Sequence, residues 1–189
     1  MQRFAIILGG GRSSRMGRPK RDLVLDGRSL FARAVDACRA RTVIVAVTPE
    51  LPADLHDERV RRTCEDPPFG GPVAGIAAGL AALPPAEPDD EVLLLACDLA
   101  TPAEVVATLD AAPLGEDGVC LVEADGTPQY LAARYRLSAL TRALGGQDSR
   151  DRSVKATMSA LALHHVPAPG LAADLDTPHE AATAGVQLL

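Results

Sequence analysis

Three short segments of the chain are apolar at every position instead of alternating between apolar and polar residues. They cover Phe4–Leu8, Val43–Val47 and Val92–Cys97. Uninterrupted runs of valine, isoleucine and leucine of this length are typical of parallel strands that are covered on both faces. We therefore predict three buried parallel strands here. Three further runs are predicted as strands of the same sheet: Val119–Glu123, Tyr130–Ala133 and Leu163–Val166.

The stretches between these runs place apolar residues at helical spacing. Leu30, Ala34 and Cys38 fall on one stripe, and Ser29 stands in front of them where its hydroxyl can cap the helix. Pro72 opens a second apolar stretch with the same spacing, and proline is favoured at the first position of a helix. We therefore predict one helix after Ser29 and another that begins at Pro72.

The order of the predicted elements indicates the fold class. Two segments, Thr101–Glu104 and Thr177–Glu180, have the spacing of a capping box with proline at the first helical position. Strands and helices then alternate, which predicts an α/β fold with right-handed crossovers. We expect a single domain over residues 1–189 with three layers, in which a Rossmann-like, doubly wound and mostly parallel sheet lies between helices. Ligands of such sheets bind outside the carboxyl ends of the strands.

Composition excludes several classes of partner. The chain has a net charge of −6 and only 3% aromatic residues, with no tryptophan. Duplex-binding proteins usually carry a basic face, and proteins that bind single strands stack bases on aromatic side chains, so we expect no nucleic-acid partner. The first apolar run is too short to span a bilayer and no cleavage site follows it. We therefore expect a cytoplasmic protein without a membrane partner.

Cysteine and histidine spacing gives no sign of a zinc or redox site. Cysteines are too far apart to form a C-x-x-C pair, so we expect each to be a small buried side chain. The cysteines are Cys38, Cys64, Cys97 and Cys120. The histidines lack metal-ligand spacing and are expected to be structural or surface residues. They are His56, His164, His165 and His179.

The first apolar run leads into a glycine-rich and cationic loop, LGGGRSSRMGRPK, at residues 8–20. Its spacing does not fit the P-loop, because arginine follows Gly17, nor the dinucleotide fingerprint, because position 14 is serine. Backbone N–H groups in such a loop can converge on a polyphosphate. Arg15 could bind two phosphate oxygens at once, and Lys20 could supply a point charge. The alternative is a solvated turn with a basic flank.

This loop resembles the signature L-x-G-G-x-S-x-R-M-G-x-x-K of nucleotidyltransferases that make activated sugars and cofactors. Within that superfamily it is most similar to the molybdenum-cofactor guanylyltransferases, which usually have alanine where this chain has Gly9. The resemblance implies a fold of the nucleotide-diphospho-sugar transferase type. It implies catalytic roles for Arg15, Lys20 and Asp98. It also implies nucleotide contacts by Leu8, Gly9, Gly10, Gly11 and Lys20.

Residues 65–76 resemble the acidic residue and the G-P-L-A-G-I segment of the same family. Gly71 and Gly75 would let the start of a helix approach a nucleotide closely. The carboxylate of Asp66 could accept hydrogen bonds from the N1–H and N2–H₂ groups of guanine. The alternative is that Asp66 only begins a turn before Pro67.

Asp98 directly follows the most apolar strand. Mg²⁺ prefers oxygen ligands and typically uses one or two carboxylates together with substrate phosphates. By resemblance, Asp98 is the metal-binding aspartate of the family and a nucleotide contact. The alternative is that Asp98 caps the following helix, which is disfavoured if Thr101 already does so.

The C-terminal part of the chain supplies weaker candidates. Asp174 and Asp176 resemble the closing motif of the family, in which Asp176 would be a second metal ligand or would orient the acceptor substrate together with Asp174. Alternatively, Asp176 only ends a strand and starts a helix. Gln129–Tyr135 resembles a family stretch Q-P-L-x-A-x-Y, with tyrosine in place of proline, and Arg152 lies where the family has a basic segment near the acceptor.

The reaction that the resemblance implies is transfer of GMP from GTP to molybdopterin with release of pyrophosphate, in molybdenum cofactor biosynthesis, with Mg²⁺ as cofactor. An acceptor phosphate is already ionised at neutral pH, so no general base is needed. Transient contacts with other cofactor-biosynthesis proteins or the recipient apoenzyme are compatible with this role, and the oligomeric state stays open. Alternatives are the same chemistry with CTP, a sugar-phosphate nucleotidyltransferase and a non-catalytic nucleotide-binding relative.

Overall fold

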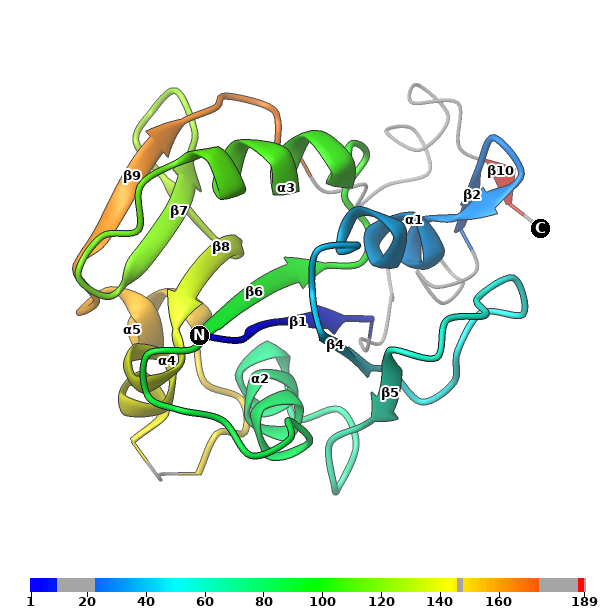
Figure 1. Cartoon of the computed structure of the whole chain (residues 1–189), viewed down its shortest axis with the longest axis horizontal. Coiled ribbons are helices and arrows are strands. Elements are labelled where there is room, and N and C mark those ends of the chain that lie inside the picture. The colour runs from blue at the N-terminus through cyan, green and yellow to red at the C-terminus, as the bar shows by residue number, and fades with distance from the viewer. Residues whose placement is uncertain (10–22, 146–147, 174–186, 189) are drawn as a thin grey trace.

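The computed structural model describes residues 1–9, 23–145, 148–173 and 187–188. A seven-stranded sheet in the order β5-β4-β1-β6-β8-β7-β9 runs through the centre of the molecule (Figure 1). Within this sheet β8 is antiparallel to β6 and β7, and the other pairs are parallel, as predicted. Its strands are β1 (Arg3–Leu8), β4 (Val43–Val47), β5 (Val60–Thr63), β6 (Glu91–Ala96), β7 (Gly118–Val122), β8 (Pro128–Arg136) and β9 (Leu163–Pro167).

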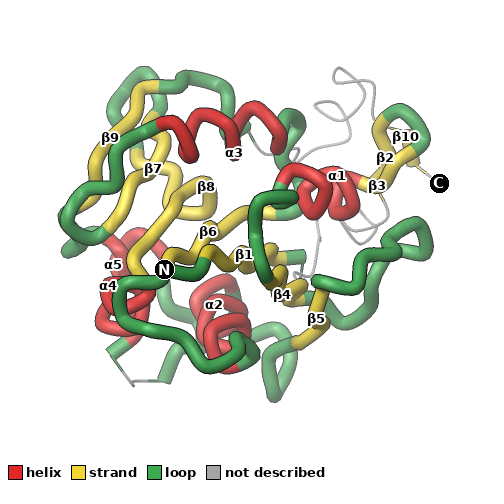
Figure 2. Tube along the Cα trace, in the orientation of Figure 1, coloured by secondary structure: helices red, strands yellow, loops and turns green. Residues whose placement is uncertain are grey.

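Helices cover both faces of the sheet (Figure 2). On one face lie α1 (Leu30–Ala37) and α3 (Pro102–Ala111). On the other face lie α2 (Pro72–Ala81), α4 (Leu137–Leu144) and α5 (Val154–Met158). The three-layer, doubly wound architecture expected from the sequence is therefore confirmed.

A second, three-stranded sheet was not predicted. It consists of β2 (Leu23–Leu25), β3 (Arg28–Ser29) and β10 (Gln187–Leu188), in the order β10-β2-β3. The turn between β2 and β3 is Asp26–Gly27, and both residues have positive φ angles. Aspartate–glycine is a strong sequence signal for such a two-residue hairpin. The strands themselves are too short to show an alternating pattern.

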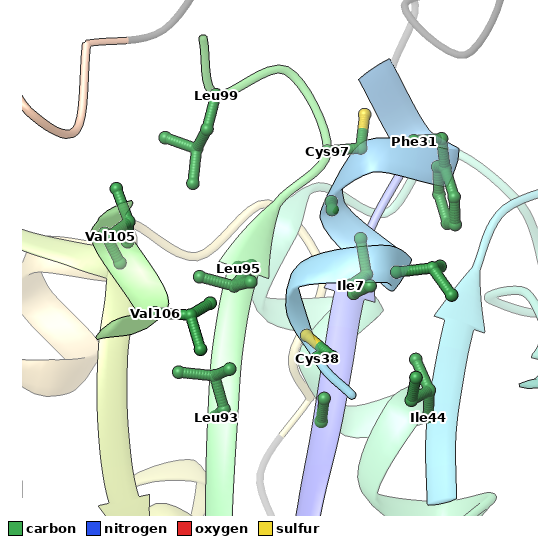
Figure 3. Packing of buried hydrophobic residues seen from close by; sticks show 14 of the residues in the cluster. Ile7, Phe31, Cys38, Ile44, Leu93, Leu95, Cys97, Leu99, Val105 and Val106 are labelled. Carbon is green, nitrogen blue, oxygen red and sulfur yellow. The ribbon is translucent and has the colours of Figure 1, made fainter. Parts of the chain in front are cut away.

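The apolar core is divided between the two faces of the sheet, which explains why its central strands are apolar at every position. Ile7 of β1 and Leu93 and Leu95 of β6 belong to the cluster beneath α1 and α3 (Figure 3). The neighbouring Ile6 and Leu94 belong to the cluster beneath α2 and α4. Successive residues of a strand point to opposite faces, so a strand that is covered on both sides needs apolar residues throughout.

The three predicted helix starts within the described residues are confirmed, since α3 also begins where expected, at Pro102, but the predicted capping bond of Thr101 is absent. Ser29 Oγ accepts a hydrogen bond from Ala32 N at 3.1 Å, and Pro72 is the first residue of α2. Thr101, in contrast, makes no side-chain capping bond to α3. Its hydroxyl donates to the carbonyl of Leu171 at 3.5 Å and so joins the start of α3 to the segment that follows β9. The other predicted capping box, Thr177–Glu180, lies outside the described residues.

The prediction that all cysteines are buried is wrong for Cys64. Cys38, Cys97 and Cys120 are buried, and burial raises the pKa of the Cys38 thiol to about 12 and that of Cys120 to about 11. Cys64 is exposed because it directly follows β5, the outermost strand on its side of the sheet. His56, His164 and His165 are exposed, as expected, and His179 lies outside the described residues.

No helix in the described part of the chain is long and apolar enough to cross a membrane.

A buried ion pair lies at the opposite edge of the sheet from the carboxyl ends of its parallel strands. Arg134 Nη1 donates to Glu91 Oε2 at 2.8 Å, and both side chains are almost fully buried. Arg134 Nη2 also donates to the carbonyl groups of Leu109 and Ala112, so this arginine joins β8 to the end of α3.

We expect Glu91→Ala to destabilise the protein by about 3 kcal/mol, because it leaves the buried Arg134 guanidinium without its counter-ion. Asp89→Ala is the matched control. That side chain is 87% exposed and lies 4.0 Å from Arg136, so its loss should change stability by less than about 0.5 kcal/mol. Urea unfolding of both variants measures the difference, and equal midpoints would contradict it.

Candidate nucleotide site

The loops that follow β1, β4 and β6 begin at the same edge of the sheet. Leu8, the last residue of β1, is paired with Val47 on one side and with Ala96 on the other. The next residue, Gly9, donates from its backbone N–H to the carbonyl of Val47 at 2.9 Å, and Cys97 N donates to the carbonyl of Leu8 at 3.0 Å. The glycine-rich loop therefore leaves the sheet between the ends of β4 and β6.

Packing explains why position 9 is glycine. A Cβ atom at Gly9 would lie 2.3 Å from Cε2 of Phe31, a fully buried residue of α1. This distance is far shorter than any real carbon–carbon contact, so Phe31 occupies the space that an alanine methyl group would need. The sequence predicted Gly9 as a nucleotide contact, and the structure adds that its missing side chain also accommodates a core aromatic ring.

Asp98 is buried, with 3% of its surface exposed, two residues beyond the end of β6. In the described ranges, no three histidine, cysteine, aspartate or glutamate side chains come together as a metal site. A single carboxylate at this position suits a hard cation that takes its other ligands from water and substrate phosphates. The failure of Thr101 to cap α3 removes the argument by which the sequence disfavoured a capping role for Asp98.

The second predicted loop contains a carboxylate that the sequence analysis did not choose. Asp66 is exposed, whereas the neighbouring Glu65 is half-buried. Glu65 Oε2 accepts a hydrogen bond from Phe69 N at 3.3 Å, and its Oε1 lies 3.2 Å from where a Cβ atom of Gly75 would be. Glu65 is therefore the carboxylate that faces the start of α2. The sequence contained its signal, since the two acidic residues are adjacent.

Glycine is needed at positions 71 and 75 for different structural reasons. Gly71 has a φ angle of +86° at the cap of α2, a conformation that side chains other than glycine rarely adopt. Gly75 is buried within α2, where a Cβ atom would lie 3.3 Å from Leu8 Cδ2. Gly75 thus allows α2 to pack closely against the end of β1, from which the glycine-rich loop begins.

Residues 150 and 151, far along the chain, contact the loop between β5 and α2. Arg150 Nη1 donates to the carbonyl of Pro67 at 2.7 Å, and Asp151 N donates to the carbonyl of Gly70 at 2.8 Å. The predicted acceptor residue Arg152 instead donates to the carbonyl of Leu144, at the end of α4, at 3.0 Å. Arg152 therefore has a structural partner, and Arg150 is the arginine that contacts the candidate nucleotide loop.

Six of the predicted site residues lie outside the described residues and stay predictions. They are Gly10, Gly11, Arg15, Lys20, Asp174 and Asp176. The described chain nevertheless leads to each of these segments, since Gly9 lies at the ends of β1 and β4 and Ala173 follows the segment that Thr101 contacts.

A pocket of about 440 Å³ lies beside Leu99, the residue after Asp98. Its other walls come from residues 125–127 in the turn between β7 and β8, from the beginning of β8, from α5 and from Ala172. Because β8 is antiparallel to β6, its first residues lie at the carboxyl end of β6. A search for candidate residues at strand carboxyl ends therefore misses them, although the resemblance of Gln129–Tyr135 to a family motif had marked this stretch.

This combination defines the class of protein. A mostly parallel sheet with a glycine-rich first loop and a buried aspartate at the same edge is the architecture of nucleotide-binding α/β domains. Residues 5–165 match the family model of the MobA-like NTP transferase domain. The chain belongs to this family.

Curated relatives agree with this assignment. The chain is 32% identical over 157 residues to a probable molybdenum cofactor guanylyltransferase of Opitutus terrae, an alignment that covers 82% of this chain and 77% of the relative. It is 41% identical over 78 residues to the molybdenum cofactor guanylyltransferase of Rhizobium meliloti, which covers 40% of this chain. The same alignment spans only 36% of the length of the Rhizobium meliloti protein.

Solved structures share the fold. The molybdopterin-guanine dinucleotide biosynthesis protein A of Archaeoglobus fulgidus superposes with a TM-score of 0.64 at 21% sequence identity. The superposition covers 96% of each chain, so the shared fold extends over almost the whole length of both.

We expect Gly9→Ala to destabilise the protein by about 1–3 kcal/mol, because the added methyl group overlaps Phe31. In the background of Phe31→Leu, which removes the overlapping ring atoms, the same substitution should cost clearly less. Urea unfolding of the wild type, the two single variants and the double variant measures the coupling. Additive effects would show that the two side chains do not compete for this space.

Proposed function

We propose that the protein is a nucleotidyltransferase that transfers GMP from GTP to molybdopterin, with release of pyrophosphate, in molybdenum cofactor biosynthesis. Membership of the MobA-like NTP transferase family and the names of the curated relatives support this proposal. The structural observation that carries it is the buried carboxylate of Asp98 at the same edge of the sheet as the start of the glycine-rich loop.

The triphosphate would lie along the loop after β1. Backbone N–H groups of Gly10 and Gly11 would donate to its oxygens, as in other glycine-rich phosphate loops. Gly9, whose N–H is bonded to the carbonyl of Val47, would contact the nucleotide only through its Cα atom. Arg15 and Lys20 would neutralise the charge that develops on the departing pyrophosphate. Leu8, at the end of β1, would form part of the floor beneath the nucleotide.

The guanine base would lie over the loop before α2. Asp66 would accept from the Watson–Crick edge of guanine. Gly71 would let the nucleotide approach the start of α2, and Gly75 brings this helix close to Leu8 at the end of β1. Glu65 is the alternative carboxylate for the base, because it already faces the start of α2.

A divalent cation, proposed to be Mg²⁺, would be held by Asp98, with Asp176 as a weaker second candidate. When bound, Mg²⁺ stabilises negative charge on the phosphate oxygens. Burial of Asp98 restricts the rotamers that its side chain can adopt, as the precise placement of a ligand oxygen requires.

The reaction needs little covalent chemistry from the protein. An oxygen of the acceptor phosphate attacks the α-phosphorus of GTP, the bond to the β-phosphate bridging oxygen breaks, and pyrophosphate leaves with that electron pair. Because the attacking oxygen is already ionised, the site residues act by positioning the two substrates and by charge neutralisation. Arg152, Asp174 and Asp176 are weak candidates for contacts with the acceptor.

In this role the protein would act in the cytoplasm on two small-molecule substrates. Transient contacts with other cofactor-biosynthesis proteins or with the recipient apoenzyme belong to the same proposal.

Purified protein should release pyrophosphate when it is incubated with Mg²⁺, molybdopterin and GTP. Each of the other nucleoside triphosphates is tested in parallel, and molybdopterin is supplied with and without molybdate. Release with CTP alone would replace the guanylyltransferase by a cytidylyltransferase. Release with no triphosphate would contradict the proposal.

We expect Asp98→Asn to lower kcat at least about a hundredfold, because a neutral amide holds a divalent cation poorly. The Mg²⁺ concentration that gives half-maximal rate should also rise. Asp89→Asn is the matched control, since this aspartate is exposed and remote from the site, and its kinetics should equal those of the wild type. An unchanged metal dependence in Asp98→Asn would rule out a ligand role.

Lys20→Ala should lower kcat by a similar factor without a change in folding, because it removes the positive charge that would stabilise the leaving pyrophosphate. Arg61→Ala, at an exposed position of β5, is the control for loss of a surface cation. Turnover and the urea midpoint are measured for both variants, and a wild-type rate for purified Lys20→Ala would disprove this role.

A further inference from the structure

The pocket beside Leu99 is built by an irregularity in the sheet. In the ladder between β7 and β8, Cys120 is paired with Ala133, but the next residue, Leu121, is paired with Gln129. The intervening segment 130–132 therefore bulges out of this ladder, and all of its residues line the pocket. β-Bulges often occur beside active sites, where they redirect a side chain.

The bulge is held by a partly buried hydrogen bond. The hydroxyl of Tyr135, a fully buried residue, donates to the carbonyl of Tyr130 at 2.9 Å. Burial raises the pKa of Tyr135 well above its usual value, so its hydroxyl stays protonated and remains a donor. The backbone at Tyr130 is thus fixed from the core side, and the aromatic ring of Tyr130 forms part of the pocket wall.

Two further parts of the pocket are held by Glu123. Its Oε1 accepts from the side-chain amide of Gln129 at 3.4 Å, and its Oε2 accepts from the backbone of Gly170 at 2.8 Å. One carboxylate therefore orients Gln129 and anchors the segment that contains Ala172, another residue of the pocket. Since Gln129 uses its amide nitrogen for this contact, its carbonyl oxygen is the atom that can accept from a ligand.

The chemical lining of the pocket favours a flat heterocycle with an anionic group. Leu99, Leu131 and Val154 provide apolar surface and Tyr130 provides an aromatic side chain. Lys155 provides one positive charge and Asp125 one negative charge, so the lining can bind both an anionic group and an N–H donor. A volume of about 440 Å³ lies in the range of small-molecule sites, which are mostly apolar with a few polar groups that fix orientation. A nucleotide triphosphate would need several cations, whereas Lys155 is the one cationic residue among those that line this pocket.

We propose that this pocket receives the pterin ring system of the acceptor, with Tyr130 against the ring face, the Gln129 carbonyl on a ring N–H and Lys155 beside an anionic group. The inference rests on the proposed function and deepens it, because it places the acceptor on the β8 side of Asp98. Leu99 is shared between this pocket and the loop that carries Asp98, so an acceptor bound here extends toward the nucleotide edge of the sheet.

Steady-state kinetics of Tyr130→Ala and Lys155→Ala test the pocket. Each variant should raise the KM for molybdopterin about fivefold or more and leave the KM for GTP within about twofold, because the lost contacts belong to the acceptor alone. Tyr130→Phe keeps the ring and Lys155→Arg keeps the charge, so both should stay within about twofold of the wild type.

A binding measurement gives a readout besides activity. Molybdopterin is titrated into the protein without nucleotide, and quenching of its pterin fluorescence is recorded for the wild type and the four variants. We expect weaker binding for Tyr130→Ala and Lys155→Ala only. Lys155 is exposed on α5, so this variant should fold normally even if Tyr130→Ala does not.

The outcomes distinguish the inference from the proposed function. If the wild type binds molybdopterin and releases pyrophosphate, but both alanine variants keep wild-type affinity for molybdopterin, the pocket assignment is overturned and the proposed function stands. If the wild type neither binds molybdopterin nor releases pyrophosphate with any triphosphate, the proposed function falls, and the pocket assignment falls with it.

Discussion

The candidate site depends on the alignment of the last residues of β1, β4 and β6, which lie side by side at one edge of the sheet. Two backbone hydrogen bonds fix this alignment, one from Gly9 N to the carbonyl of Val47 and one from Cys97 N to the carbonyl of Leu8. They extend the parallel hydrogen-bond ladders by one residue, so the loops begin only after Gly9 and Cys97. The glycine-rich loop and the aspartate at position 98 therefore start from neighbouring points on a rigid edge, which is where doubly wound sheets bind ligands.

Close packing beneath this edge restricts the residues above it. Phe31 occupies the space beside Gly9, and α2 packs against Leu8 through Gly75. Glycine at positions 9 and 75 thus serves the core, in addition to the nucleotide contact that we propose for each position. Protein interiors are packed as densely as organic crystals, so even one added methyl group at such a position must displace a neighbour. Under the proposed function, a substitution at either position would therefore affect stability as well as binding.

The sequence predicted those features that depend on long, regular patterns. Buried parallel strands need apolar residues at every position, and this requirement identified β1, β4 and β6 almost to the residue. Features decided by tertiary contacts were missed. Thr101 has a capping sequence but contacts Leu171, and Cys64 follows an edge strand. The position of Glu65 against the start of α2 depends on how the loop folds back on this helix, whereas the sequence shows only that Glu65 and Asp66 are adjacent carboxylates.

The antiparallel direction of β8 gives the two sides of the site different construction. The parallel strands contribute loops that follow their last residues, whereas β8 contributes its first residues to the same edge, since Leu95 is paired with Ala132. Residues at the beginning of β8 still belong to the sheet, so their backbone is fixed by neighbouring strands and by Tyr135. A flat acceptor needs such a preformed wall, because its binding energy comes from shape and contact area. A flexible triphosphate is better matched by convergent backbone N–H groups in a loop.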